Sequence, residues 1–348
     1  MNLAEQRYDK KKFNLAVFGL SIAIVASIAN ATFPIFNSSE MDMVTAQMGV
    51  GDILIALYIV TLICVSTAEI LAAIFTIIFN TIKGGYPLAE YGRIWKVKVS
   101  RTILISAILG GPIGTACNMI ATKLCGVTYT AIIVGLTPVI SVVLARIFLK
   151  EKLKARAILG VCIVVVGCIV AALAPPEGVE NFYLGIAIAC LCPLAFAGEN
   201  IISTHAVDVC DPRIACPFYR MLGAAAIELT ISLVVAICTG HLDIFTGAFA
   251  TLFSMPKALL FMVMTSIFMS IQYNMTYTAY TYCGAVRAGS LLFAYSAFTV
   301  PVGVILAGFG VAEYNITGLA IIATAITVLG IILVIGNPKE IFTLRDTK

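Results

Sequence analysis

Charged side chains are scarce in this sequence. Lys and Arg contribute 22 residues and Asp and Glu 18, together 11% of the 348 residues, whereas soluble domains carry about 25% charged residues. Hydrophobic residues make up 61% of the chain and the mean hydropathy is +1.04. A soluble protein of this composition would expose far more apolar surface than soluble proteins tolerate. The composition therefore excludes a water-soluble enzyme, a disordered regulator and a nucleic-acid-binding protein, and it indicates a polytopic membrane protein.

Histidine is nearly absent, with two residues, and the sequence contains neither a His-x-x-His grouping nor a Walker A phosphate-binding motif. The eleven cysteines are scattered through apolar segments, where a lone cysteine behaves as a small hydrophobic side chain. We therefore expect no metal, no cofactor and no nucleotide hydrolysis. The alternative classes are an integral-membrane enzyme, which would need a nucleophile and base or a metal cluster at one membrane face, and a channel-like scaffold.

Ten apolar runs are long enough to cross a bilayer, which takes a helix of about 20 residues. They cover residues 13–36, 52–80, 101–122, 126–149, 157–174, 182–207, 213–239, 257–281, 285–311 and 316–336. Nineteen of the 22 basic residues fall in segments that share a side with the N-terminus, and only Lys123 and Lys257 fall in segments on the other side. Because basic loops stay in the cytoplasm, the sequence predicts an all-α membrane protein with ten transmembrane helices and both termini inside.

The two halves of the chain resemble each other. Four residues recur 158 positions later: Ala121, Cys125, Gly126 and Gly160 match Ala279, Cys283, Gly284 and Gly318. Since each copy holds five helices, an odd number, the second copy enters the membrane upside down, and such inverted repeats are typical of transporters. We therefore divide the chain into a cytoplasmic segment 1–12, a first repeat 13–174, a second repeat 182–336 and a cytoplasmic tail 337–348.

The stretch from Pro138 to Gly167 combines a proline-bearing helix, the basic and acidic turn FLKEKL, and a helix with spaced glycines. Tyr219 and Arg220 add an arginine at the start of a later helix. Together with the ten-helix pattern, these features resemble the drug/metabolite transporter superfamily, particularly its bacterial EamA-type members. The resemblance implies transport by alternating access, but it names no substrate, because the superfamily moves chemically diverse solutes in both directions.

Three carboxylates lie deep inside predicted spans, where a charge is costly. Glu69 and Glu228 occupy equivalent places in the two copies, about 16 Å from a helix end at about 1.5 Å per residue. Glu199 has Asn30 as its counterpart. These groups are candidates to line a central cavity, where they would bind a cation or a substrate ammonium, or carry a coupled proton. The structural alternative is that each carboxylate pairs with Arg, Tyr or backbone at a helix contact.

Tyrosines spaced i, i+4 and i+7 share one helix face at Tyr273, Tyr277 and Tyr280. The first two would offer ring faces to a cation, with core packing as the alternative, whereas Tyr280 is expected in the interfacial aromatic belt. Asn118 shares a polar face with Thr115. The predicted substrate site comprises Glu199, Asn30, Tyr273, Asn274, Tyr277, Asn118 and Tyr295.

Arg220 lies one to two turns inside its span, and we expect it to snorkel to the interface. The alternatives are pairing with Glu228 or with a substrate carboxylate. Candidates for ion or proton coupling are Glu69, Glu228 and His205, the last of which could instead be structural. Proline inside a span removes a backbone hydrogen bond, and the candidate hinges are Pro138, Pro193 and Pro301.

These observations predict a secondary active transporter, not an enzyme, that moves a small organic metabolite by alternating access. The acidic and aromatic residues favour an amino acid or organic amine, because an anionic substrate would need several convergent basic residues. Energy would come from an H+ or Na+ gradient or from the solute gradient. The expected partners are the substrate and membrane lipid, in a monomer or homodimer of the bacterial inner membrane.

Overall fold

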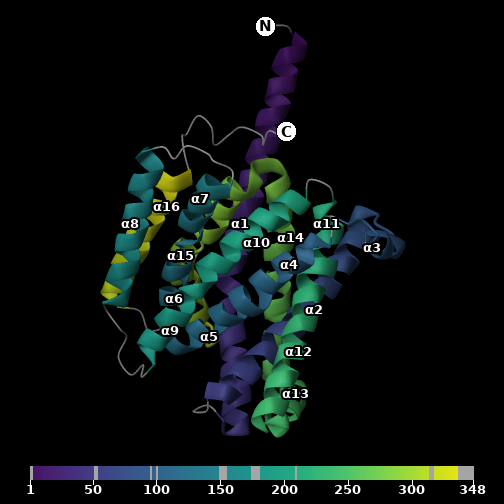
Figure 1. Cartoon of the computed structure of the whole chain (residues 1–348), viewed down its shortest axis with the longest axis vertical. Helices are drawn as coiled ribbons and strands as arrows, with labels where there is room; N and C mark the ends of the chain where they lie inside the picture. The colour runs from purple at the N-terminus through teal and green to yellow at the C-terminus, as the bar shows by residue number, and fades with distance from the viewer. Residues whose placement is uncertain are drawn as a thin grey trace.

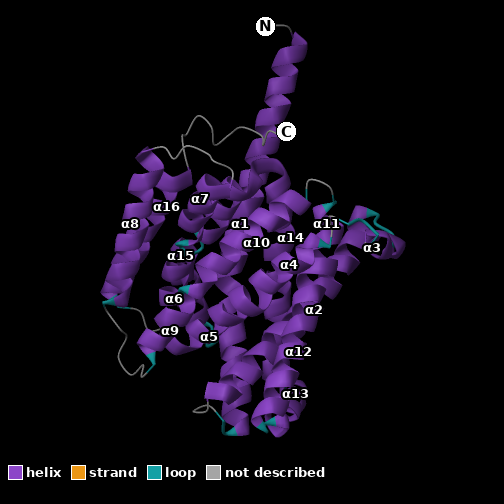
Figure 2. Ribbon diagram, in the orientation of Figure 1, coloured by secondary structure: helices purple, strands orange, loops and turns teal. Residues whose placement is uncertain are grey.

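The computed structural model describes residues 3–50, 54–94, 96–98, 101–148, 155–173, 181–207, 210–312 and 317–335. Within these ranges every regular element is a helix (Figure 2). The elements are α1 (Leu3–Met48), α2 (Leu54–Gly84), α3 (Leu88–Ile94), α4 (Thr102–Ile108), η1 (Leu109–Thr115), α5 (Ala116–Cys125), α6 (Val127–Val134), α7 (Thr137–Phe148), α8 (Ala155–Ala172), α9 (Phe182–Ala189), α10 (Leu191–Ala206), α11 (Pro212–Ala215), η2 (Cys216–Met221), α12 (Leu222–Thr239), α13 (Leu242–Ser254), α14 (Pro256–Phe293), α15 (Ser296–Gly308) and α16 (Gly318–Ile335). The tail 337–348 and most of the FLKEKL turn lie outside the described residues.

Seven helical segments in the described part of the chain are long and apolar enough to cross a membrane, and four further apolar helices are shorter. In each of the ten apolar runs found in the sequence, most of the described residues are helical. Two stretches expected to be loops are helical as well. α1 continues to Met48 through residues 37–48, and α13 occupies most of the segment between 239 and 257. Both extra stretches bury apolar side chains such as Val44 and Leu252 in the main core, which explains why they fold as helix.

Several of the long helices are interrupted. η1 and η2 are π-helical turns that contain Pro112 and Pro217, respectively, and a proline cannot donate the backbone bond that a regular α-helix requires there. Gly126 and Gly284, which the sequence repeat matches at 158 residues, both adopt a positive φ, of 92° and 74°. At both positions the chain leaves the helical path, which glycine allows without the steric cost of a Cβ.

The central part of the molecule is built around α1, α2 and α14. α1 packs along α14, and α2 packs against α12 and α14 (Figure 1). α8 and α16 pair at one side, where Gly167 and Gly330 let the two backbones approach closely. A cluster of polar side chains lies where α2, η1, α10, η2 and α14 meet.

Candidate functional site

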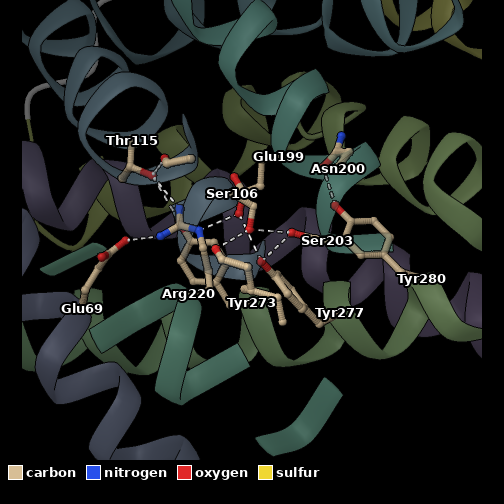
Figure 3. Close-up of polar contacts among 12 residues, drawn as sticks. Glu69, Ser106, Thr115, Glu199, Asn200, Ser203, Arg220, Tyr273, Tyr277 and Tyr280 are labelled. Atoms are coloured by element: carbon tan, nitrogen blue, oxygen red, sulfur yellow. Dashed lines mark hydrogen bonds and ion pairs between the residues drawn. The ribbon is translucent and has the colours of Figure 1, made fainter. Parts of the chain in front are cut away.

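A buried guanidinium lies at the centre of the molecule. Arg220 belongs to η2, and its side chain has no exposed surface. Its Nε donates to Glu199 Oε1 of α10 over 2.5 Å, and its Nη1 donates to Glu69 Oε1 of α2 over 3.0 Å. Figure 3 shows the two carboxylates reaching the guanidinium from different sides. The π-helical turn places Arg220 one step out of α-helical register, and such turns are frequent at functional sites.

The remaining guanidinium nitrogen binds hydroxyl groups. Nη2 donates to Tyr273 OH over 2.7 Å and to Thr115 Oγ1 over 3.3 Å, and the two hydroxyls lie 3.1 Å apart. Cζ also lies 4.5 Å from the centroid of the Tyr273 ring, a cation–π contact. All three guanidinium nitrogens are thus engaged, as a buried arginine requires.

Glu199 joins this cluster to a second set of hydroxyls. Tyr277 OH lies 3.4 Å from Glu199 Oε1 and 2.9 Å from Ser203 Oγ. Ser203 in turn donates to Ser106 Oγ of α4 over 3.0 Å. One turn further along α14, Tyr280 OH donates to Asn200 Oδ1 (Figure 3). Neighbouring positions of α10 and α14 therefore form a continuous polar contact between the two helices.

Glycine in η1 makes room for the carboxylates. A Cβ on Gly110 would overlap the Glu199 carboxylate, and one on Gly111 would lie 2.6 Å from the Cβ of Ala224 and 3.1 Å from Glu228 Oε1. The Gly110-Gly111-Pro112 sequence thus serves close packing of η1 on α10 and α12. The backbone approach also brings the Thr115 hydroxyl within reach of Arg220.

Glu228 differs from the other two carboxylates. It is fully buried on α12, and neither of its oxygens has a hydrogen-bond partner among the described residues. Glu69 Oε2 is likewise without a partner there. Three carboxylates therefore share one region with a single guanidinium, and burial of an uncompensated carboxylate is costly. At least one of them must be neutral or must acquire a cation.

A small cavity adjoins the cluster on the Glu199 side. Its volume is about 20 Å³, enough for a water-sized group. Among the described residues that line it, Glu199 is the one charged side chain. The helices α1, η1, α5, α10 and α14 contribute polar side chains. These polar residues are Asn30, Thr115, Asn118, Asn200, Gln272, Tyr273, Thr276, Tyr277 and Tyr280, and the aromatic rings of Phe33, Phe196 and Phe293 complete the wall. Gln272 Oε1 and Thr276 Oγ1 are buried without a partner among the described residues.

The structure brings together five of the seven residues predicted for the substrate site. The residues that line the cavity are Glu199, Asn30, Asn118, Tyr273 and Tyr277. Tyr295 is buried in a cluster with Phe196 and Phe293 but does not line the cavity. Asn274 is partly exposed and also lies outside the wall, because it falls on a different face of α14.

Two expectations about side-chain depth are wrong. Arg220 does not snorkel to the interface, and it pairs with Glu69 and Glu199, not with Glu228. Tyr280 is not a belt residue, because it is buried and bonded to Asn200. In both cases a polar partner on another helix compensates the side chain inside the protein, so it has no need to reach water.

The remaining candidates lie away from the cluster or at helix ends. His205 is exposed in the last turn of α10. Pro138 and Pro193 stand in the first turns of α7 and α10, each directly after a break in its span, whereas Pro301 lies within the continuous helix α15. Pro138 and Pro193 thus directly follow interruptions of their spans, whereas Pro301 comes five residues after the start of α15, and their role as hinges stays a prediction.

Sequence reasoning missed Asn200, Ser203 and Ser106. A signal for the first two was present, because Asn200 is adjacent to Glu199 and Ser203 follows it at the i+4 spacing of one helix face. Ser106 had no such signal, since only the packing of α4 against α10 brings it to Ser203.

Comparisons with known proteins identify relatives. Residues 17–173 match the model of the EamA-like transporter family. Protein LicB of Haemophilus influenzae is 22% identical over 266 residues, which cover 68% of this chain and 87% of that protein. A solved crystal structure aligns over 90% of this chain and 94% of its own, with a TM-score of 0.55 and 17% identity, which shows a shared fold alone. Together with the long apolar helices, the family match makes this an integral multi-pass membrane protein.

Proposed function

We propose that this chain, whose residues 17–173 match the model of the EamA-like transporter family, is a secondary active transporter of a small organic metabolite, with an amino acid or organic amine as the favoured class. The observation that carries the proposal is the central cavity, whose one charged wall residue is Glu199. The cavity lies between helices from both halves of the chain, where transporters of this kind bind their solute.

The wall favours a positively charged group over an anion. Arg220, the buried cation nearby, already donates to two carboxylates and two hydroxyls, so it has little capacity left for a substrate carboxylate. Glu199, by contrast, faces the cavity beside the rings of Tyr273 and Tyr277. An ammonium group placed there would meet a carboxylate, amide oxygens and aromatic faces, all of which attract a cation.

Transport would require the helices around the cavity to separate. A volume of about 20 Å³ is too small for an amino acid or amine, so this conformation is an occluded or empty one in the proposed cycle. The breaks before Pro138 and Pro193 and the non-helical glycines Gly126 and Gly284 are the candidate points of movement.

The proposed topology has ten crossings with both termini inside, as two inverted five-helix repeats over 13–174 and 182–336. Support comes from the positive φ angles of Gly126 and Gly284, which are 158 residues apart, and from the helical structure of most described residues in all ten apolar runs. The bias of basic residues favours this orientation, and the bacterial inner membrane is the proposed location.

Coupling to an H+ or Na+ gradient would use a carboxylate that changes its charge or its partner during the cycle. Glu228 and Glu69 are the candidates that the geometry favours, since among the described residues Glu228 has no hydrogen-bond donor and Glu69 Oε2 has no partner. His205 is a weaker candidate, because its exposed position separates it from the buried cluster.

Counterflow in proteoliposomes tests the proposal. Purified protein is reconstituted with unlabelled solute inside, and uptake of labelled solute is followed for a panel of amino acids and amines, first ranked by the rise in melting temperature that binding to the folded state produces. We expect saturable counterflow for at least one zwitterion or amine, and its loss in Glu199→Gln.

The matched control is Glu90→Gln, which alters a partly exposed glutamate of α3 that pairs with Arg93 and should leave counterflow unchanged. A membrane enzyme or a channel-like scaffold would show no counterflow with any solute. Binding by anions alone would contradict the favoured substrate class and would place the site at Arg220.

A further inference from the structure

A fourth buried carboxylate lies on α1, beyond the part of that helix that lines the cavity. Glu40 is fully buried in the part of α1 that extends beyond residue 36. It is seven residues beyond Phe33, the last α1 residue in the cavity wall, which corresponds to about 10 Å along the helix axis at about 1.5 Å per residue. Glu40 is therefore separate from the Arg220 cluster, and nothing in the proposed substrate site uses it.

The polar neighbours of this carboxylate are the Asn37 amide and the Cys64 thiol, and no cation pairs with it among the described residues. Neither Glu40 oxygen has a hydrogen-bond partner among the described residues, and the same is true of both polar atoms of the Asn37 amide. Asn37 is also fully buried and lies three residues earlier, on the same helix face. The Cys64 thiol of α2 is a further polar neighbour. Two unpartnered polar side chains thus face the same buried space.

Charged groups on the surrounding helices are engaged elsewhere. Asp42 of α1 forms an ion pair with Lys123 of α5, and both are partly exposed. Lys257 at the start of α14 lies over the ring of Phe261, with its nitrogen 5.6 Å from the centroid. Asp243 of α13 is exposed. Within the described part of the chain, Glu40 therefore has the neutral Cys64 thiol as its titratable neighbour and no ion-pair partner.

The hydrogen-bonding chemistry of a carboxyl group beside an amide favours the neutral, protonated form of Glu40. An ionised carboxylate only accepts hydrogen bonds, so it would leave the Asn37 oxygen unsatisfied and would keep a charge in an apolar core. A protonated carboxyl can donate to Asn37 Oδ1 while its other oxygen accepts from Asn37 Nδ2. One proton thus allows both groups to be satisfied by small side-chain rotations.

We propose that Glu40, with Asn37, is a proton-binding site in the half of the molecule where α1 meets the start of α2. The site holds a proton in this conformation. Its part in solute coupling rests on the proposed function, whereas proton binding itself does not. In the transport cycle it would exchange protons with the compartment at that end of α1, one step before the buried Glu69 and Glu228.

Infrared spectroscopy of the reconstituted full-length protein tests proton binding directly. At neutral pH we expect a carbonyl band of a protonated carboxyl group that is lost in Glu40→Gln and changes frequency in Asn37→Ala, which removes the hydrogen-bond partner. Asp42→Asn alters an exposed carboxylate two residues away and should leave the band in place. Glutamine is isosteric with protonated Glu40, so this variant is expected to fold. A band of equal intensity in wild type and Glu40→Gln would overturn the proposal.

The role in coupling needs a second readout. Solute-driven proton movement, followed with a pH-sensitive dye in the same proteoliposomes, should be lost in Glu40→Gln while solute counterflow persists. Retained proton movement in Glu40→Gln, or solute uptake driven by Na+ alone, would overturn the coupling role. Absence of counterflow in the wild type would defeat the proposed transport function, and the infrared band would still decide whether Glu40 binds a proton.

Discussion

Arg220 Nε and Glu199 Oε1 lie 2.5 Å apart, although their residues belong to separate helical segments and are 21 positions apart in the sequence. The same guanidinium reaches Glu69, which is 151 positions away. One side chain thus ties η2 to both α10 and α2.

Replacing Arg220 should destabilise the protein strongly. Arg220→Met removes the cation and leaves Glu69 and Glu199 buried without it, and removing one partner of a buried ion pair costs about 3–5 kcal/mol. The melting temperature in detergent should fall clearly below that of wild type. Arg220→Lys should recover only part of the loss, because an ammonium cannot reproduce the guanidinium geometry.

Arg213→Met is the control for this substitution. Arg213 is exposed and pairs with Asp211 at 3.4 Å, and surface pairs contribute about 0–1 kcal/mol. Equal melting temperatures for Arg220→Met and Arg213→Met would show that the buried network does not stabilise the fold.

A methyl group at Gly110 should disrupt the cluster by steric overlap. The Cβ of Gly110→Ala would meet the Glu199 carboxylate, and overpacking of this kind costs about 1–3 kcal/mol. We expect a lower melting temperature and loss of counterflow. Gly92→Ala in α3 is the matched control, because no atom lies within 4 Å of its new methyl group. If Gly110→Ala were as stable as wild type, the new methyl group would not overlap the Glu199 carboxylate, which would contradict the close packing of η1 on α10.

Removal of the Tyr273 hydroxyl should separate the contribution of its hydrogen bond to stability from that of its aromatic ring. Tyr273→Phe loses the bond from Arg220 Nη2, and hydrogen bonds to charged groups contribute about 1.5–3 kcal/mol. The ring that lies 4.5 Å from the guanidinium carbon is retained, so the loss should be smaller than in Tyr273→Ala.

Tyr282→Phe serves as the control on the same helix, because its ring packs edge-on against Phe18 and a phenylalanine preserves that contact. Chemical denaturation monitored by fluorescence or circular dichroism would rank the three variants. Equal stability of Tyr273→Phe and Tyr273→Ala would contradict a separate contribution from the ring.

Tyr86 should make stability depend on pH in the alkaline range. It lies between α2 and α3, outside the membrane-spanning segments, and its hydroxyl donates to Asp211 Oδ2 over 2.6 Å. Burial, followed by the Asp211 carboxylate, raises the pKa of Tyr86. The raised pKa favours the protonated phenol in the folded state. The Tyr86 phenol therefore contributes its full share to the free energy of unfolding below its pKa in the unfolded chain, about 10. This contribution is lost as the pH rises through the pKa of Tyr86 in the folded protein.

Tyr86→Phe tests this dependence. The melting temperature of the variant should be lower than that of wild type near neutral pH, and the difference should shrink above about pH 10. A scan of melting temperature against pH for both proteins provides the measurement. A difference that stays constant across the scan would show that the Tyr86 phenol does not titrate differently in the folded and unfolded states.

Local patterns in the sequence predicted the helices well, but they misassigned residues 37–48. Asn37 and Glu40 are polar, so this stretch resembles a loop between two spans. In the structure both side chains are buried on a continuous helix, while Met41 and Val44 enter the core. A window of sequence cannot tell a buried polar residue from an exposed one, because burial is decided by what the rest of the chain places beside it.

The candidate site was predicted in part for the same reason. Glu69, Glu199 and Glu228 could be identified because a carboxylate in an apolar run is costly to bury, and Tyr273 and Tyr277 because their spacing places them on one face. Their partners could not be identified. Arg220 is near the end of its span, and only the π-helical turn and the approach of η1 turn it inward.

By itself, the sequence determined that this is a helical membrane protein with carboxylates and tyrosines inside its spans, since hydrophobicity and helical periodicity are local properties. The tertiary structure alone decided which of those groups meet. In the structure, Arg220 pairs with Glu69 and Glu199, and a cavity lies beside Glu199. The carboxylate oxygens of Glu228 and Glu40 have no hydrogen-bond partner of good geometry among the described residues. Such pairings depend on helix packing between distant segments, and no local pattern encodes the distance between them.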